Sequence, residues 1–164
     1  MNESEKRKYR VCFTGHRPEK LSTSEEFIKQ QLYNEIIKST QDGFNVFISG
    51  MARGVDIWAS EIVLQLKSEG HPVKLICALP YNGFERNWKA YWQNKYNLIL
   101  SHADLVRYIS PRYSPDCFKS RNEWMVNHSS RVIAVYNGKS GGTKNTIKYA
   151  KIQNISVHII SDNF

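Results

Sequence analysis

The sequence predicts an α/β fold, a Rossmann-like three-layer sandwich with a mainly parallel sheet. Short apolar runs rich in valine, isoleucine and phenylalanine alternate with segments of helical periodicity. Parallel strands joined by helices require right-handed crossovers, which cover both faces of the sheet. A polar segment with glycine or proline follows five of the apolar runs. These segments should therefore share the carboxyl edge of the sheet, where open α/β folds bind ligands.

The first half of the chain predicts two strand-helix units. Residues 11–13 form a short apolar strand, and apolar side chains then recur at helical spacing between residues 22 and 43. Residues 45–48 form the second strand. A second helix, 55–69, ends before Gly70, because glycine commonly stops helices.

The same alternation continues in the second half. Residues 73–79 form a third strand, and an apolar stripe with Trp88 and Trp92 predicts a helix over 84–101 packed against the sheet. The remaining elements are a strand at 105–109, a helix at 118–128, a strand at 132–136, a helix at 143–153 and a strand at 157–160.

Length and composition favour one globular domain over residues 1–164, with a charged, flexible segment at 1–9. Hydrophobic residues make up 41% and charged residues 23%, as in soluble proteins. Because the chain lacks a signal-peptide core and any run near the ~20 apolar residues of a membrane span, we expect a cytoplasmic protein without a membrane partner. The three cysteines lack metal-type spacing, and we predict no metal site.

The charge of the chain predicts an anionic partner. Lysine and arginine number 23 against 15 aspartates and glutamates, which gives a net charge of +8. Many of these cations lie in the polar segments after the strands or at the starts of the following helices. We therefore expect the anion to bind at the carboxyl edge of the sheet.

The segment after the second strand resembles a phosphate-binding loop, because its glycines allow close backbone approach and the next helix presents free N–H groups. It lacks the ending of a Walker loop and the spacing of a dinucleotide fingerprint, so ligand contact and a tight turn are equal explanations. Asp56 would repel a phosphate, and we favour its contact with ribose or a base over a metal. The candidates are Ser49, Gly50, Met51, Arg53, Gly54 and Asp56.

Three further segments supply candidates. After the first strand, Arg17 can grip a phosphate with paired donors, whereas His16 can bind, exchange a proton or only stabilise its own loop. Two glycines before the last helix can bring amides to an oxyanion, and Thr143 can cap that helix. Arg121 and Asn122 form either an anion clamp or part of a solvated helix face. The candidates are Thr14, Gly15, His16, Arg17, Arg121, Asn122, Gly141, Gly142 and Thr143.

The segment after the third strand, with Pro80 and Tyr81, supplies the stacking candidate. Four aromatic residues, Tyr81, Phe84, Trp88 and Trp92, are candidates for a wall on which a nucleobase stacks. Tyr81 is preferred, because Trp88 and Trp92 are four residues apart on a helix and are expected to be buried against the sheet.

Four motifs together carry a family resemblance. In chain order they are Thr14-Gly15-His16-Arg17-Pro18, Ser49-Gly50-Met51-Ala52-Arg53-Gly54-Val55-Asp56, Arg121-Asn122-Glu123-Trp124-Met125-Val126 and Gly141-Gly142-Thr143. With them the chain resembles the YpsA-like and YoqJ-like proteins of the SLOG superfamily over nearly its whole length. The resemblance implies a Rossmann-like fold, a pocket for a nucleotide or nucleotide-sugar compound, and a homodimer. The expected function is binding or sensing of such a ligand, including its sequestration.

Two alternative functions are also predicted. Segment 49–56 looks like the glycine loop of the DNA-processing protein DprA, whose relatives bind single-stranded DNA. A more distant similarity to the Lonely Guy phosphoribohydrolases implies N-glycosidic hydrolysis of a nucleoside monophosphate, with Asp56, Glu123 or His16 as catalytic candidates. The Pro-Gly-Gly-x-Gly-Thr-x-x-Glu motif of that family corresponds here to residues 140–146, which contain no matching glutamate. We therefore favour a ligand-binding protein over an enzyme.

Overall fold

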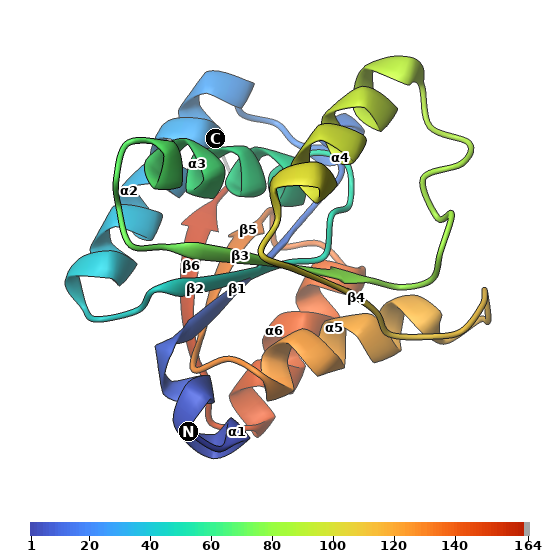
Figure 1. Ribbon diagram of the computed structural model, residues 1–164. Coiled ribbons are helices and arrows are strands. Elements are labelled where there is room, and N and C mark those ends of the chain that lie inside the picture. The colour runs from blue at the N-terminus through green and yellow to red at the C-terminus, as the bar shows by residue number, and fades with distance from the viewer. Residues whose placement is uncertain (163–164) are drawn as a thin grey trace.

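A computed structural model describes residues 1–162 and contains a six-stranded sheet in the order β4-β3-β2-β1-β5-β6 (Figure 1). Every pair of neighbouring strands is parallel. The predicted fold class is confirmed. The strands are β1 (Arg10–Gly15), β2 (Val46–Ser49), β3 (Lys74–Leu79), β4 (Leu105–Tyr108), β5 (Arg131–Tyr136) and β6 (Ser156–Ser161).

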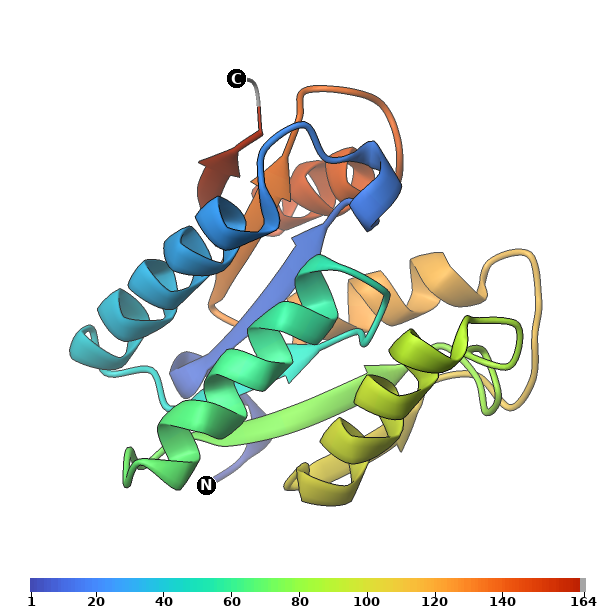
Figure 2. The same cartoon turned by 90° about the horizontal axis from the view of Figure 1, so that it is seen from above.

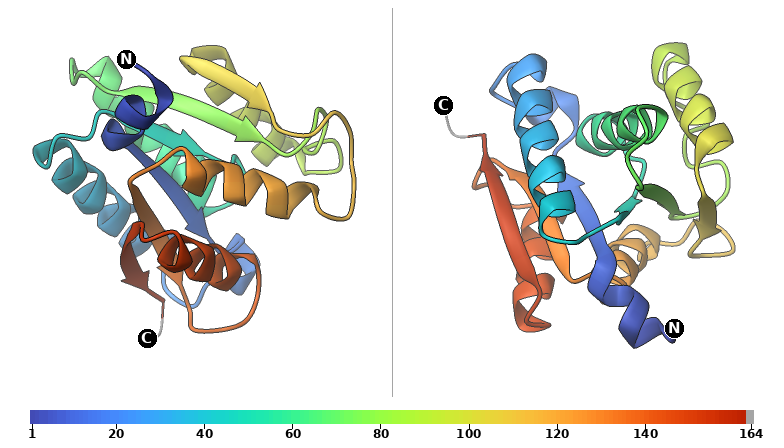
Figure 3. Two further views of the ribbon diagram at one scale, coloured as in Figure 1. Left: turned by 90° about the horizontal axis from the view of Figure 1, so that it is seen from below. Right: turned by 60° about the vertical axis from the view of Figure 1, so that its left-hand side comes forward.

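Helices cover both faces of this sheet. One face carries α2, α3 and α4, which lie in front of the sheet in Figure 2. The opposite face carries α5 and α6, as Figure 3 shows. The helices are α1 (Glu3–Lys6), η1 (Arg7–Tyr9), η2 (Pro18–Lys20), α2 (Glu25–Gln41), α3 (Val55–Ser68), α4 (Ala90–His102), α5 (Cys117–Asn127) and α6 (Gly142–Ile152).

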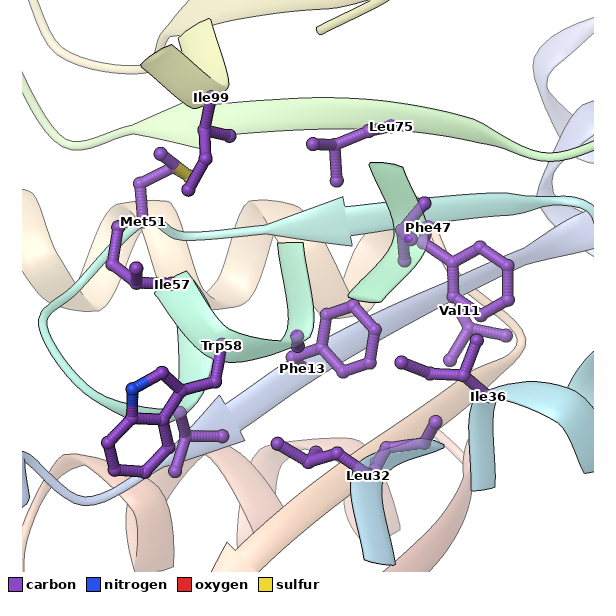
Figure 4. Close-up of a cluster of buried hydrophobic side chains, with 14 of the residues drawn as sticks. Val11, Phe13, Leu32, Ile36, Phe47, Met51, Ile57, Trp58, Leu75 and Ile99 are labelled. Atoms are coloured by element: carbon purple, nitrogen blue, oxygen red, sulfur yellow. The ribbon is translucent and has the colours of Figure 1, made fainter. Parts of the chain in front are cut away.

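The alternation of side chains along each strand divides the core into two layers. In β1, Val11 and Phe13 face α2 and α3, whereas Cys12 between them belongs to the cluster under α5 and α6. Phe13 stacks on Phe47 of β2 with ring centroids 5.9 Å apart, and Figure 4 shows both rings inside the larger cluster. Burial of these apolar side chains is the main force that fixes the helices to the sheet.

The strand order creates a topological switch beside β1. The chain passes from β1 outward through β2 and β3 to β4, and then returns to pair β5 with the other side of β1. Because the connections on the two sides of β1 lie on opposite faces, a crevice opens at the carboxyl end of β1.

One helix begins later than the sequence predicts. α4 starts at Ala90, so the prediction of helix over 84–89 is wrong. Those residues form turns after Gly83, whose φ of +91° favours glycine. The side chain of Gln93 donates to the carbonyls of Glu85 and Arg86 at 3.1 and 2.9 Å, which replaces the hydrogen bonds of a continuous helix.

The amino-terminal segment has contacts with the body of the protein. The Arg7 guanidinium donates to the carbonyl of Ser129 at 2.8 Å and to that of Val126 at 3.2 Å. The flexibility expected for residues 1–9 stays a prediction. Within residues 1–162 no helix is both long and apolar enough to cross a membrane.

We predict that Gly15→Ala destabilises the protein. A Cβ atom at Gly15 would lie 2.5 Å from a methyl carbon of Val55, at the point where β1 meets the start of α3. The expected loss is about 1–3 kcal/mol in the free energy of unfolding, measured by urea denaturation. Gly142→Ala is the matched control, because its Cβ would meet only Asn122 Nδ2 at 3.9 Å. Equal stability of the two variants would contradict the prediction.

Candidate functional site

A cleft of about 290 Å³ lies at the carboxyl edge of the sheet, beside the end of β1. Its walls come from four of the segments that the sequence indicated, and these segments lie together around the end of β1. Of the predicted binding residues, the cleft is lined by Thr14, Gly15, His16, Arg17, Arg53, Asp56, Arg121, Asn122, Gly141, Gly142 and Thr143.

Asp56, in the first turn of α3, is the buried acid of this cleft. Its Oδ2 accepts the N–H of Ala52 at 3.2 Å, whereas Oδ1 has no hydrogen-bond partner among residues 1–162. Burial raises the pKa of Asp56 to about 6, against the lowering effects of the Arg121 guanidinium and the Ala52 N–H. The site therefore contains a carboxylate oxygen that is free to accept a hydrogen bond from a ligand.

Arg121 brings a buried positive charge from α5 to the same cleft. Its Nη1 donates to the carbonyl of Gly50 and, at 3.5 Å, to that of Ala78, while Nε donates to Asn122 Oδ1 at 2.8 Å. A Cβ at Gly50 would lie 2.8 Å from Arg121 Nη1 and 3.0 Å from Asp56 Oδ2. Glycine is needed at position 50 because two charged side chains pack against its backbone.

The rest of the glycine loop fixes its own shape and does not line the cleft. Ser49 Oγ accepts the N–H of Met51 and donates to the carbonyl of Asp56, both at 3.1 Å. Met51 is fully buried at φ +61°, and Gly54 has φ +91° with a Cβ position 2.8 Å from Pro18. These predicted residues therefore affect the cleft indirectly, because they fix the position of α3.

His16 joins two loops of the site. Its Nε2 accepts the backbone N–H of Asn137 at 3.2 Å, and its ring stacks on Tyr136. Burial lowers the pKa of His16, which favours the neutral imidazole that this hydrogen bond requires. The arrangement favours the alternative in which His16 stabilises its own loop.

The cations of the cleft differ in their pairing. Arg53 forms a forked pair with Glu19 at 3.0 and 3.4 Å, which ties the loop after β2 to η2. In the described part of the chain, the exposed Arg17 guanidinium makes no ion pair or side-chain hydrogen bond. Arg17 is therefore available to an anion, and Lys20 lines the same cleft.

Thr143 does not cap α6, which corrects one of the predicted roles. The helix begins at Gly142 with Gly141 as its N-cap, and no side chain hydrogen-bonds to this end. Gly54, at the start of α3, also provides no side-chain cap. Two helices thus direct amino termini without side-chain caps to the cleft, an arrangement that suits oxyanions.

Besides residues of the glycine loop, three further predicted residues lie outside the cleft. Glu123 lines a second groove, between α5 and α6, and neither Pro80 nor Tyr81 lines the cleft. Tyr81 packs edge-on against the rings of Phe84, Tyr113 and Phe118. The prediction that places these three residues in one pocket with the glycine loops is wrong.

The sequence reasoning missed several residues that line the cleft. Phe84 and Trp88 belong to the predicted stacking wall but are not among the preferred candidates, and they reach the cleft from the turn at 84–89. Phe118 stands three residues before Arg121, so helical spacing was the signal that could have found it. The missed lining residues are Phe13, Lys20, Ala52, Phe84, Trp88, Phe118, Met125 and Ser140.

The fold and the cleft define a Rossmann-like α/β protein with a polar crevice at its topological switch point. The chain belongs to the YspA SLOG family, whose model matches residues 11–161. It is 34% identical to a UPF0398 protein of Bacillus cereus over 151 residues, which cover 86% of this chain and 82% of the relative. A UPF0398 protein of Bacillus thuringiensis is 33% identical over the same length. The resemblance to the SLOG superfamily is thereby confirmed.

Solved structures of DNA processing protein A (DprA) share the fold. The Streptococcus pneumoniae protein superposes with a TM-score of 0.67 at 19% identity, over 93% of this chain and 50% of the other. The Helicobacter pylori protein, which binds single-stranded DNA, has a TM-score of 0.65 at 18% identity and covers 96% of this chain. This chain spans half of the pneumococcal protein and 66% of the Helicobacter protein.

We predict that Asp56→Asn stabilises the protein at neutral pH. The unfolded chain ionises Asp56 near 3.8, but the folded protein does so at about 6. The wild type and Asp56→Asn should be equally stable below about pH 4. As the pH rises to 6, ionisation of the buried acid destabilises the wild type relative to the variant. Above pH 6 the variant should be more stable by up to about 3 kcal/mol.

Urea unfolding at a series of pH values measures this difference. Asp116→Asn, at an exposed position outside the cleft, is the control and should follow the wild type. A stability difference between Asp56→Asn and the wild type that does not change between pH 4 and 7 would show that Asp56 ionises normally.

Proposed function

We propose that this protein binds a nucleotide or a nucleotide-derived small molecule in the cleft, and that it senses or sequesters this ligand. The observation that carries the proposal is the unpaired Oδ1 of Asp56, on a side chain that is only 6% exposed. A buried acceptor without a partner costs about 1–3 kcal/mol, and a ligand hydroxyl would remove that cost. A ribose hydroxyl has the required donor.

A second part of the cleft lining, at residues 141–143, suits the phosphate of such a ligand. The amino terminus of α6 lies there without a side-chain cap, preceded by Gly141 at φ +144°. Arg17 adds an exposed guanidinium that forms no ion pair with an acid of the described chain. The backbone amides of a helix start and a free arginine together form a common phosphate site.

We predict that nucleoside monophosphates stabilise the protein against heat and that Arg17→Ala weakens this effect. At a hundred times the dissociation constant a ligand adds about 2.7 kcal/mol to folding stability. Loss of one charged contact should weaken affinity about tenfold or more. Thermal shift and calorimetry with AMP, GMP, CMP and UMP measure both effects.

Lys151→Ala is the matched control, because it removes one exposed cation at the far end of α6. It should bind each nucleotide as the wild type does. If no nucleotide or nucleotide sugar shifts the melting temperature, the proposal fails.

The hydrolase alternative has one supporting observation, the raised pKa of Asp56, which suits a general base near neutral pH. Glu123, the alternative catalytic acid, lines the other groove. Chromatography of the same nucleotide incubations for free base separates binding from hydrolysis.

A second candidate function is binding of single-stranded DNA, favoured by three cations that line the cleft, Arg17, Lys20 and Arg53. The similar Helicobacter protein binds such DNA. If each cation neutralises one phosphate, affinity for an oligothymidylate should fall about 20-fold between 50 and 200 mM salt, and less steeply in Arg17→Ala. Fluorescence anisotropy measures the affinity at each salt concentration. An affinity that does not depend on salt would exclude this candidate function.

The homodimer and the cytoplasmic location expected from the sequence stay predictions. The family and the fold support the coarser statement, that the chain is a member of a bacterial SLOG family with a Rossmann-like structure.

A further inference from the structure

Part of the cleft lining is aromatic. Phe84 and Trp88 reach the cleft from the turn before α4, and Phe118 reaches it from the first turn of α5. Asp56 and Arg121 line the same space. Charged groups and apolar rings thus border a single cavity.

The rings from the turn are held in place by their neighbours. Trp88 packs edge-on against Phe84 at 5.1 Å and against Tyr96 at 5.6 Å between ring centroids. Tyr96 lies in the core and is 2% exposed. Because the indole is already fixed in the free protein, contact with a ligand would cost little side-chain entropy.

Phe118 is fixed on the other side of the aromatic cluster. The Arg121 guanidinium lies 5.9 Å from the centroid of its ring, and Tyr81 packs edge-on at 6.3 Å. Phe118 is nevertheless 42% exposed. A large apolar side chain that stays exposed beside the buried Arg121 guanidinium is available to a flat partner.

We propose that Phe84, Trp88 and Phe118 bind the aromatic base of the ligand, so that the site selects base-bearing nucleotides over sugar phosphates. This inference rests on the proposed function. The single cleft has two kinds of lining, a polar part that includes Asp56 and the start of α6, and an aromatic part. A nucleotide has the same two parts, and every nucleobase can stack on an aromatic ring.

The test compares a nucleotide with the same molecule lacking its base. Calorimetry should show that the best of the four nucleoside monophosphates binds at least about tenfold more tightly than ribose 5-phosphate. Trp88→Leu should weaken that nucleotide about tenfold and leave ribose 5-phosphate unchanged. Trp88→Phe, which keeps an aromatic ring, should restore part of the loss.

Trp124→Leu is the matched control. Trp124 stacks on His128 at 4.0 Å and does not line the cleft, so this variant should keep the preference for the base. Quenching of tryptophan fluorescence by the nucleotide should persist in Trp124→Leu and be lost in Trp88→Leu.

Two results would overturn the inference and leave the proposed function standing. In the first, ribose 5-phosphate binds as tightly as the nucleotide. In the second, Trp88→Leu weakens both ligands equally, which would indicate general damage to the cleft. If the wild type binds neither ligand, the proposed function and the inference both fail.

Discussion

The arrangement of the site depends on the buried guanidinium of Arg121. It comes from α5, on one face of the sheet, and donates to carbonyls at the ends of β2 and β3. The same group lies close enough to Asp56 to lower the pKa of that acid. One side chain thus connects α5, two strands and the start of α3 at the edge where the chain changes direction. A neutral side chain in its place would leave the Gly50 carbonyl oxygen without this donor and Asp56 without a nearby positive charge.

The motif glycines serve two different purposes, which bears on how such motifs are interpreted. Gly15, Gly50 and Gly54 are required by packing, since an added Cβ would meet Val55, Arg121 or Pro18 within 3 Å. Gly141 and Gly142 have room for a side chain and precede free amides of α6. Close packing therefore explains the first group, whereas the absence of a side chain in the second leaves the backbone open to a ligand.

The sequence predicted the strands and most helices because period-two and helical patterns are local properties. It could not predict the strand order, which depends on contacts between distant segments, nor the turn at 84–89, where Gln93 satisfies two carbonyls. The turn bears on the preference for Tyr81 as the platform, since Phe84 and Trp88 line the cleft from this turn while they also pack against the core. Thr143 failed as a cap for a similar reason, because α6 begins one residue earlier.

A buried acid with an unpaired oxygen makes the free protein less stable than it would be with an apolar side chain, so its presence calls for a compensating interaction. Structural roles of Asp56 account for Oδ2, which accepts the Ala52 amide, but not for Oδ1. The nearby guanidinium reduces the cost of the charge without removing it, as the raised pKa shows. Proteins commonly accept such instability where a site must be ready for its ligand. The proposed ligand would supply the donor that Oδ1 lacks in the free protein.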